Sequence, residues 1–215
     1  MKIVVYTAIF GGYDKLWSPS VADPEVDYIC LVDKKIPCPK PWQMKILDVK
    51  HTDPRRQARY CKINSHTMFP DANYTIWHGG NVQLRCKPNV LIDILDNDNV
   101  AAIKHSLRDC IYDEARECKL VGRGKPSAIE SQMIRYRVCG YPTHRGLHAT
   151  FLLVRRNSDA TSRLNKLWWK EVYNGSVRDQ LSFDYVCWRH KFKVATIPGD
   201  IFSGKCYGRF EQHGK

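Results

Sequence analysis

The sequence lacks the long apolar segments that direct a chain into a membrane or out of the cell. Within its 215 residues no hydrophobic run approaches the length of a membrane span, and Met1–Tyr6 has the pattern of a short strand rather than of a signal peptide. Nine cysteines are present, but none forms a Cys-x-x-Cys pair or stands at zinc-finger spacing to a histidine. We therefore expect a soluble, cytoplasmic protein without a membrane span, in which most cysteines are reduced core residues.

Acidic residues are scarce relative to basic ones. The 34 Lys and Arg residues against 22 Asp and Glu give a formal net charge of +12. Such an excess favours a polyanionic partner, whether nucleic acid, an anionic polysaccharide or the diphosphate of an activated sugar, although a basic surface that is simply solvated has the same composition. With 43% hydrophobic residues, the chain has enough apolar surface for one globular domain, 1–215.

No GxGxxG or Walker sequence is present, so the fold class depends on the order of the expected elements. Apolar runs separated by turn residues predict strands that alternate with helices, as an α/β sheet requires. Strands are expected at 2–6, 26–32, 44–49, 74–77, 82–84, 100–104 and 150–154, and helices at 54–68, 88–95, 127–139, from 158 and from 176. We predict a single α/β domain with a mixed, mostly parallel sheet flanked by helices.

The chain is organised around residues 70–84, PDANYTIWHGGNVQL. A buried strand, Tyr74–Trp77, stops at His78-Gly79-Gly80-Asn81 and then resumes. In α/β proteins chemistry is placed beyond the carboxyl ends of strands, and two glycines allow the backbone or a ligand to come close. A tight turn between two strands explains the same glycines.

Two earlier strand ends offer contacts to a nucleotide. Thr7, Ala8, Phe10 and Tyr13 belong to the strand-to-loop turn expected after the first strand, where hydroxyl and backbone N–H groups can meet a ligand. Asp33 ends the second strand, and a carboxylate there suits a ribose hydroxyl or a uracil edge. A turn residue before two lysines is the alternative interpretation of Asp33.

Helix starts are marked by two sequence signals. Asp53 and Pro54 predict the N-cap and first position of the helix at 54–68, and Ser127 with Glu130 forms a capping box that predicts the helix at 127–139. In the first of these helices, basic residues recur on one face, which could hold a diphosphate or simply face solvent. They are Arg55, Arg59, Lys62 and His66.

Short motifs along most of the chain resemble a glycosyltransferase-like family of GT-A type, shared by plant mucilage and cell-wall proteins and by bacterial and phage capsule-type proteins. The matching pieces are 6–14, 27–30, 59–62, 69–71, 77–81, Lys104-His105 with Arg108, 112–115 and 178–180. The resemblance implies a GT-A-like fold and transfer of a hexose or pentose from a nucleotide sugar, assisted by Mn²⁺ or Mg²⁺. The implied acceptor is a hydroxyl group on a glycan or on a hydroxymethylated DNA base.

The resemblance also implies roles for individual residues. Trp77 would contact the donor. His105, Arg108 and Glu114 would cluster at a strand end and contact the donor sugar or the metal, and Arg108 could also stabilise the leaving diphosphate. Asp179 would be the catalytic base if the transfer inverts. A purely structural, hydrogen-bonded role is the alternative interpretation of His105, and Asp179 also completes a Ser-x-x-Asp helix start with Ser176.

The family carries an aspartate where this chain has Gly79, which leaves His78 and Asn81 as metal ligands. Relatives also carry a carboxylate near the start of the strand at 150–154, where this chain has His148-Ala149-Thr150. A second hypothesis is therefore a catalytically silent module that binds a nucleotide sugar, a polyanion or nucleic acid and has lost its metal-binding aspartate.

Overall fold

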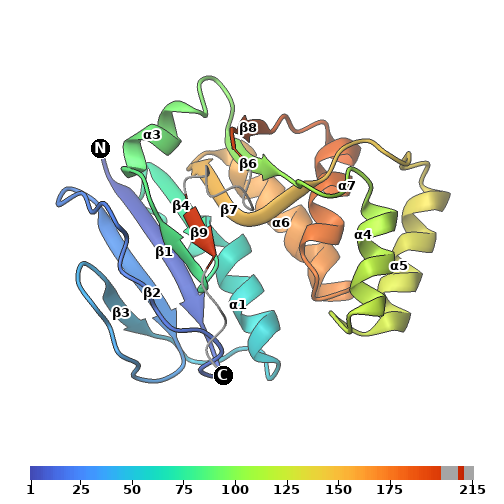
Figure 1. Ribbon diagram of the computed structural model, residues 1–215. Helices are drawn as coiled ribbons and strands as arrows, with labels where there is room; N and C mark the ends of the chain where they lie inside the picture. The colour runs from blue at the N-terminus through green and yellow to red at the C-terminus, as the bar shows by residue number, and fades with distance from the viewer. Residues whose placement is uncertain (200–207, 211–215) are drawn as a thin grey trace.

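The protein is a mixed sheet covered by helices, described by a computed structural model over residues 1–199 and 208–210 (Figure 1). Seven strands form the sheet in the order β3-β2-β1-β4-β7-β6-β8, and β5 pairs with β9 in a separate two-stranded sheet. The strands are β1 Ile3–Ile9, β2 Asp27–Val32, β3 Gln43–Ile46, β4 Tyr74–His78, β5 Val82–Leu84, β6 Val100–Lys104, β7 His148–Arg156, β8 Ala195–Ile197 and β9 Gly208–Phe210. The predicted α/β class with a mostly parallel sheet is confirmed.

Strand β7 is the antiparallel member of the large sheet. β1 pairs in parallel with β2 and β4, and β6 pairs in parallel with β8, whereas β7 lies antiparallel between β4 and β6. The register pairs His78 with Leu152 and Lys104 with His148. The start of β7 therefore lies at the same sheet edge as the ends of β4 and β6, which is the edge expected to carry the site.

Helices pack on both faces of this sheet. One core lies against α1, α4, α5, α6 and α7, and the other lies against α3 and the segment around Trp42. Successive residues of β4 alternate between them, with Trp77 in the first core and Ile76 in the second. The helices are α1 Pro54–Ile63, α2 Ser65–Met68, α3 Pro88–Asp93, α4 Ile111–Leu120, α5 Pro126–Val138, α6 Asp159–Asn174 and α7 Gln180–His190.

The structure corrects three predicted helix boundaries. The helix expected at 54–68 breaks at Asn64, whose backbone and side-chain amides both donate to the carbonyl of Tyr60 and end α1. The capping box is wrong, because α5 begins at Pro126 and its N-cap is Lys125. The last helix begins at Gln180 rather than near Ser176. The predicted N-cap at Asp53 is confirmed by its bond from the Arg55 amide at 2.9 Å.

Eight of the nine cysteines lie in the described part of the chain, and all eight are free thiols. Five of these eight are buried, as a reduced core requires: Cys30, Cys61, Cys110, Cys118 and Cys187. Cys206 lies outside the described residues. No helix within those residues combines the length and apolarity needed to cross a bilayer.

Candidate functional site at the carboxyl edge of the sheet

The ends of β1 and β2 are joined by a hydrogen bond. The Gly11 amide donates to Oδ2 of Asp33 at 2.9 Å, while Oδ1 of Asp33 is buried without a hydrogen-bond partner among the described residues. Gly11 has a φ of +67°, and a Cβ there would lie 3.3 Å from Pro54 at the start of α1. The glycine thus lets this loop fit between β2 and α1, beside a buried carboxylate oxygen of Asp33 that has no partner among the described residues.

The turn expected to begin at Thr7 begins later. β1 continues to Ile9 because Thr7, Ala8 and Ile9 pair with Cys30, Leu31 and Val32 of β2. Thr7, Ala8 and Phe10 are consequently buried, and Thr7 Oγ1 has no hydrogen-bond partner among the described residues. Tyr13 is 60% exposed. Of the four residues predicted to meet a nucleotide after β1, Tyr13 is therefore the one with a largely exposed side chain.

The central motif forms a tight turn after β4. The Gly79 amide donates to the carbonyl of Phe151 at 2.8 Å, and the Val82 amide donates to the carbonyl of Gly79 at 3.0 Å. A Cβ on Gly80 would lie only 2.8 Å from Oδ2 of Asp14, whereas a Cβ on Gly79 would have Oδ1 of Asn81 as its nearest neighbour at 3.2 Å. A side chain at position 80 would therefore displace Asp14, whereas one at position 79 requires only the Asn81 side chain to shift by a few tenths of an ångström.

His78 is buried and neutral. Burial lowers its pKa to about 4, and its Nδ1 lies 2.9 Å from the carbonyl oxygen of Gly79. The ring packs edge-on against Trp42, with ring centroids 5.4 Å apart, and Nε2 has no hydrogen-bond partner in the described chain. Among the described residues, no set of three His, Cys, Asp or Glu side chains that includes His78 converges closely enough to hold an ion.

Asp179 is the centre of a buried charge cluster. Its carboxylate forms ion pairs with Lys62 and with Nε of Arg59, the latter at 2.7 Å, and accepts a hydrogen bond from Thr150 at 3.0 Å. Trp168 donates to the backbone carbonyl of Asp179 at 3.0 Å. Residues from α1, β7 and the start of α7 thus meet beside the end of β4, although Asp179 is 117 positions from Lys62.

The protonation states in this cluster follow from burial and charge. Burial alone would raise the pKa of Asp179, but Lys62 and Arg59 together hold it well below its usual range. Burial lowers the pKa of Lys62 to about 7, although the Asp179 charge opposes that shift. Asp179 is therefore ionised at neutral pH, and Lys62 can exchange its proton in that range.

The cluster carries more positive than negative charge. The charge of Arg178 also lowers the pKa of Asp179, and Nε of Arg178 is buried without a hydrogen-bond partner among the described residues. Fully buried Arg155 lies behind Lys62, donates to its carbonyl at 2.8 Å and to the Tyr6 hydroxyl at 2.6 Å, and has no carboxylate partner in the described chain. One carboxylate for several cations leaves a site that favours an anion.

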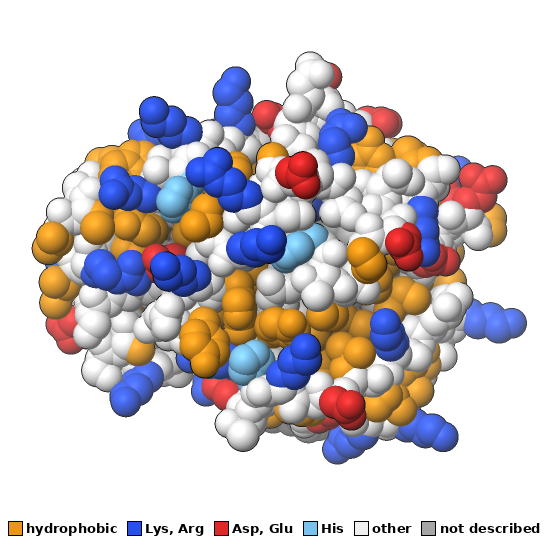
Figure 2. Space-filling model, turned by 180° about the vertical axis from the view of Figure 1, so that it is seen from behind, with side chains coloured by type: hydrophobic (Ala, Val, Ile, Leu, Met, Phe, Trp, Pro, Cys, Tyr) orange, Lys and Arg blue, Asp and Glu red, His pale blue; other side chains and the backbone are white. Residues whose placement is uncertain are grey.

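The predicted stripe of four basic residues on one helix face is only half correct. Arg59 and Lys62 face Asp179, whereas Arg55 pairs with Asp53 at 3.2 Å and His66 lies 3.2 Å from the side-chain amide of Asn165. The break at Asn64 separates His66 from the other three. Figure 2 shows Lys and Arg side chains spread over the rear face among apolar patches, so on that face the positive charge is scattered rather than gathered into one track.

His105, Arg108 and Glu114 form a second cluster, as predicted. Arg108 Nε lies 2.6 Å from the buried Glu114 carboxylate, and Nε2 of His105 lies 3.6 Å from it. Nδ1 of His105 accepts hydrogen bonds from the amides of Leu107 and Arg108 at 3.2 and 3.1 Å. These contacts fix the turn between β6 and α4, and Arg108, with a side chain 24% exposed, can still reach a ligand.

A third pair, which sequence reasoning missed, stands at the start of β7. Asp184 of α7 lies 2.5 Å from Nδ1 of His148 and accepts from the His148 amide at 2.8 Å. The strand start itself carries no carboxylate, but α7 supplies one from 36 residues away. The position of Asp184 on the buried face of α7 was the available signal, since a buried carboxylate needs a partner.

Comparisons with known proteins address the fold and the family. The sequence profile of the TOD1/MUCI70 glycosyltransferase-like domain matches residues 41–210. The probable hexosyltransferase MUCI70 of Arabidopsis thaliana is 24% identical over 216 residues, or 86% of this chain and 37% of that protein, so the chain spans just over a third of the relative. The WbbM bifunctional glycosyltransferase superposes with a TM-score of 0.52 at 10% identity, over 92% of this chain and 38% of its own. The fold is a GT-A-like α/β domain.

Proposed function

Because the chain belongs to the TOD1/MUCI70 glycosyltransferase-like family, we propose that it transfers a sugar from a nucleotide-sugar donor to a hydroxyl group of an acceptor glycan. The nucleotide would lie over the ends of β1 and β2, where Oδ1 of Asp33 has no partner among the described residues and Tyr13 is exposed. The donor sugar would then point toward the end of β4. A hydroxymethylated DNA base is the second acceptor that this chemistry allows.

The excess positive charge around Asp179 is the observation that carries the proposal. When the sugar leaves, negative charge develops on the diphosphate, and fixed cations stabilise it most in a water-poor site. Arg59, whose side chain is 26% exposed, and Lys62 are held in place by Asp179 before any substrate arrives. We assign these two residues to the diphosphate, with Arg178 as a third cation beside them.

The acceptor hydroxyl needs a proton acceptor if transfer inverts the anomeric centre. Asp179 lies in the right region, but a carboxylate paired with two cations is a weak base. His148 is held by Asp184 through Nδ1 and is close in sequence to Thr150, which donates to Asp179. We therefore propose His148 as the base alongside the original candidate, Asp179, and the pH dependence of His148→Gln and Asp179→Asn activity distinguishes them.

A divalent metal fits the carboxyl edge of the sheet only if substrate phosphates supply part of its ligands. Position 79 offers no side-chain oxygen, but Asp14 and Asn81 border the turn, and Mg²⁺ or Mn²⁺ is commonly held by one or two protein oxygens together with substrate phosphates. When bound, the metal would neutralise charge on the diphosphate. Cationic stabilisation by Arg59 and Lys62 without a metal is the competing route.

A thermal-shift screen against nucleotide sugars, each with and without Mn²⁺, tests the proposal, because a ligand that binds only the folded state raises the melting temperature. We expect a donor-dependent shift that Arg59→Gln weakens roughly 10- to 100-fold in affinity, as loss of a charge-assisted hydrogen bond predicts. Arg55→Gln is the matched control on the same helix, since Asp53 is the one ion-pair partner of Arg55 among the described residues.

The outcomes separate the competing functions. A shift that is followed by sugar transfer in the presence of acceptor glycans supports the transferase. A shift without turnover of any donor, even by hydrolysis, indicates the catalytically silent module. No shift with any donor, together with nucleic-acid binding that weakens steeply with salt, would replace the proposal with a polyanion-binding function.

A further inference from the structure

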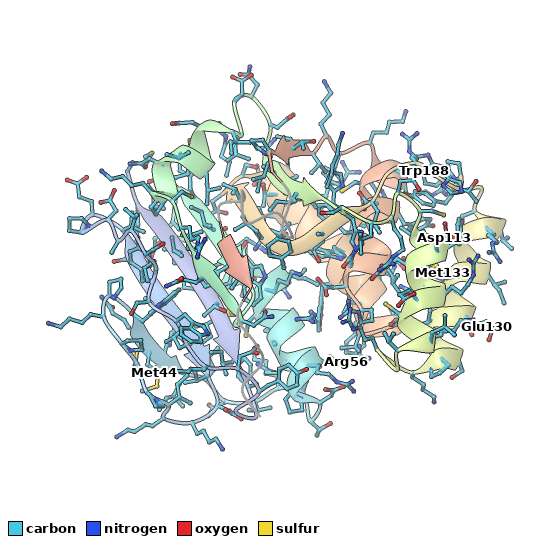
Figure 3. All side chains as sticks on the ribbon, in the orientation of Figure 1. Met44, Arg56, Asp113, Glu130, Met133 and Trp188 are labelled. Carbon is cyan, nitrogen blue, oxygen red and sulfur yellow. The ribbon has the colours of Figure 1, made fainter. Side chains whose placement is uncertain are left out.

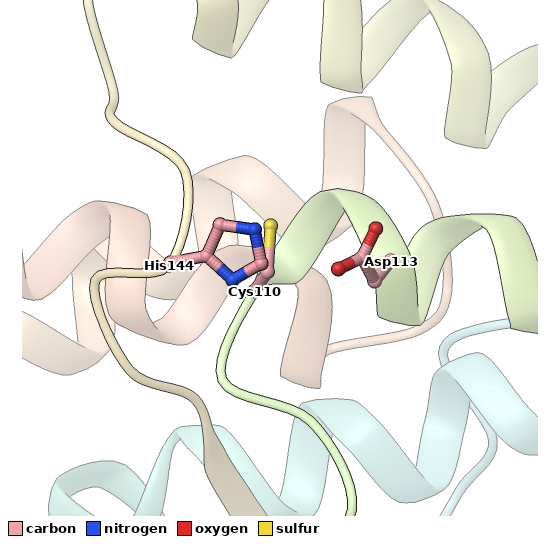
Figure 4. Close-up of side chains that lie close together, drawn as sticks. All are labelled: Cys110, Asp113 and His144. Atoms are coloured by element: carbon pink, nitrogen blue, oxygen red, sulfur yellow. The ribbon is translucent and has the colours of Figure 1, made fainter.

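A cluster of side chains typical of metal ligands lies away from the charge cluster, where α4 begins. Cys110, Asp113 and His144 each offer a ligand atom, and these atoms lie within 4.8 Å of one another (Figure 4). Cys110 and Asp113 come from the start of α4, and His144 comes from the loop that leads into β7. Figure 3 shows Asp113 on α4, on the side of the molecule opposite to Met44 of β3.

Cys110 occupies an unusual position for a cysteine. It is the N-cap of α4, a position at which Ser, Thr, Asp or Asn normally accepts a hydrogen bond from the helix, yet its side chain makes no capping bond. The residue is only 2% exposed. Asp113 stands three residues later, at the N3 position, where side chains turn back toward the N-cap. The thiol and the carboxylate therefore converge for reasons of helix geometry.

His144 is held against this helix end by its loop. Its backbone has a φ of +50°, which places the residue in the left-handed region, and its Nδ1 lies 2.8 Å from Oδ1 of Asp109. The Gly146 amide donates to the Asp109 carbonyl at 2.8 Å and secures the same loop. A carboxylate on one ring nitrogen leaves the other for a metal, which is the usual arrangement around metal-bound histidine.

We propose that Cys110, Asp113 and His144 bind a zinc ion. Sulfur, nitrogen and oxygen donors together suit Zn²⁺, whereas Mg²⁺, Ca²⁺ and Mn²⁺ prefer oxygen ligands. Binding replaces the proton of the Cys110 thiol with the metal and releases it to solvent, and the helix N-terminus favours the thiolate that forms. Asp113 pairs with Arg116 at 3.1 Å, but that pair is exposed and costs little to break.

The zinc ion would fasten the loop before β7 to the start of α4. Three protein ligands leave the fourth position to water, whereas structural zinc sites usually have four protein ligands, so we expect weaker binding than in such closed sites. The proposal does not depend on the transferase function, because it concerns the binding of the metal alone.

Isothermal titration of tag-free, reduced protein with zinc chloride tests the proposal. We expect one zinc ion per chain, a rise in melting temperature on zinc addition, and at least tenfold weaker binding by Cys110→Ser and by His144→Asn. Both variants should fold, since serine is a favoured N-cap and asparagine tolerates the left-handed conformation. Asp109→Asn should weaken binding about 10- to 100-fold by loosening the imidazole.

Cys139→Ser is the control, because Cys139 is exposed and far along the next helix. Titration with Co²⁺ adds a spectroscopic test: a thiolate-to-cobalt absorption band should appear in the wild type and in Cys139→Ser, and be lost in Cys110→Ser. The proposal is overturned if no stoichiometric binding occurs, or if Cys110→Ser and His144→Asn bind zinc as tightly as the wild type.

Discussion

Replacing Asp179 by asparagine should destabilise the fold, because it removes the carboxylate that offsets part of the positive charge of the cluster. Asparagine has the same shape, but its amide group must face either Arg59, which forms an ion pair with the carboxylate, or Lys62, which donates a hydrogen bond to it. Removing one partner of a buried ion pair costs about 3–5 kcal/mol. We expect a value toward the lower end of this range at neutral pH, because Arg59 is partly exposed and Lys62 can give up its proton.

The loss of stability caused by Asp179→Asn should also depend on pH, in a direction set by the pKa of Lys62. In the wild type, burial lowers the pKa of Lys62 to about 7, below its unfolded value of about 10.4, so the unfolded chain binds more protons and stability rises with pH above about 7. Without the Asp179 charge this pKa falls further, and the rise begins at lower pH in the variant. The difference in the free energy of unfolding between the wild type and Asp179→Asn should therefore be largest near pH 5 and shrink toward pH 7.

Urea unfolding followed by tryptophan fluorescence at pH 5, 6, 7 and 8 measures both effects. Asp159→Asn serves as the control, since this exposed carboxylate in the first turn of α6 should contribute less than about 1 kcal/mol. A loss below about 1 kcal/mol for Asp179→Asn at pH 5, or a difference that does not change from pH 5 to pH 7, would refute the account of a buried, cation-rich cluster.

Three further substitutions test side chains and turns at the carboxyl edge of the sheet. Gly79→Asp should change stability by less than about 1 kcal/mol, because its tightest Cβ contact, 3.2 Å from Oδ1 of Asn81, is relieved by a shift of that side chain by a few tenths of an ångström, and it should strengthen the Mn²⁺ dependence of the donor-induced thermal shift. Gly80→Ala should lower the urea midpoint by more than Gly79→Asp does, because its Cβ would lie 2.8 Å from Asp14. Glu114→Gln should cost about 2 kcal/mol in the same assay by removing the charged partner of Arg108, and an unchanged midpoint would show that this pair is not structural.

Local sequence signals predicted the elements that depend on neighbouring residues. The β4 strand was predicted at Tyr74–Trp77 and runs to His78, because its apolar run is buried on both faces of the sheet. The predicted N-cap Asp53 accepts a backbone hydrogen bond, and the helix predicted from 158 begins at Asp159, where the structure adds Ser158 as its N-cap. Ser127 failed as an N-cap because Pro126 already provides the first helical position, with φ fixed for a helix.

The composition of the site was less predictable, because it depends on contacts between distant segments. The sequence indicated Arg59, Lys62 and Asp179 separately, but no local pattern shows that α1 and α7 bring them together. Asp184 was missed for the same reason, since its partner His148 belongs to a strand whose neighbours are set by the whole sheet. Periodicity describes which face of an element is buried, whereas the partner across the core is a tertiary property.

The position of β7 has a consequence for how the chain folds as it is made. β6 pairs only with β7 and β8, among the described strands, and both are synthesised after it. At typical ribosomal rates the interval between Lys104 and His148 lasts on the order of 2–9 s, during which β6 has no partner and the outer edge of β4 is open. An unpaired strand edge is a template for pairing with another chain. The nascent protein should therefore depend most on chaperones in this interval, before the strand that joins β4 to β6 has left the ribosome.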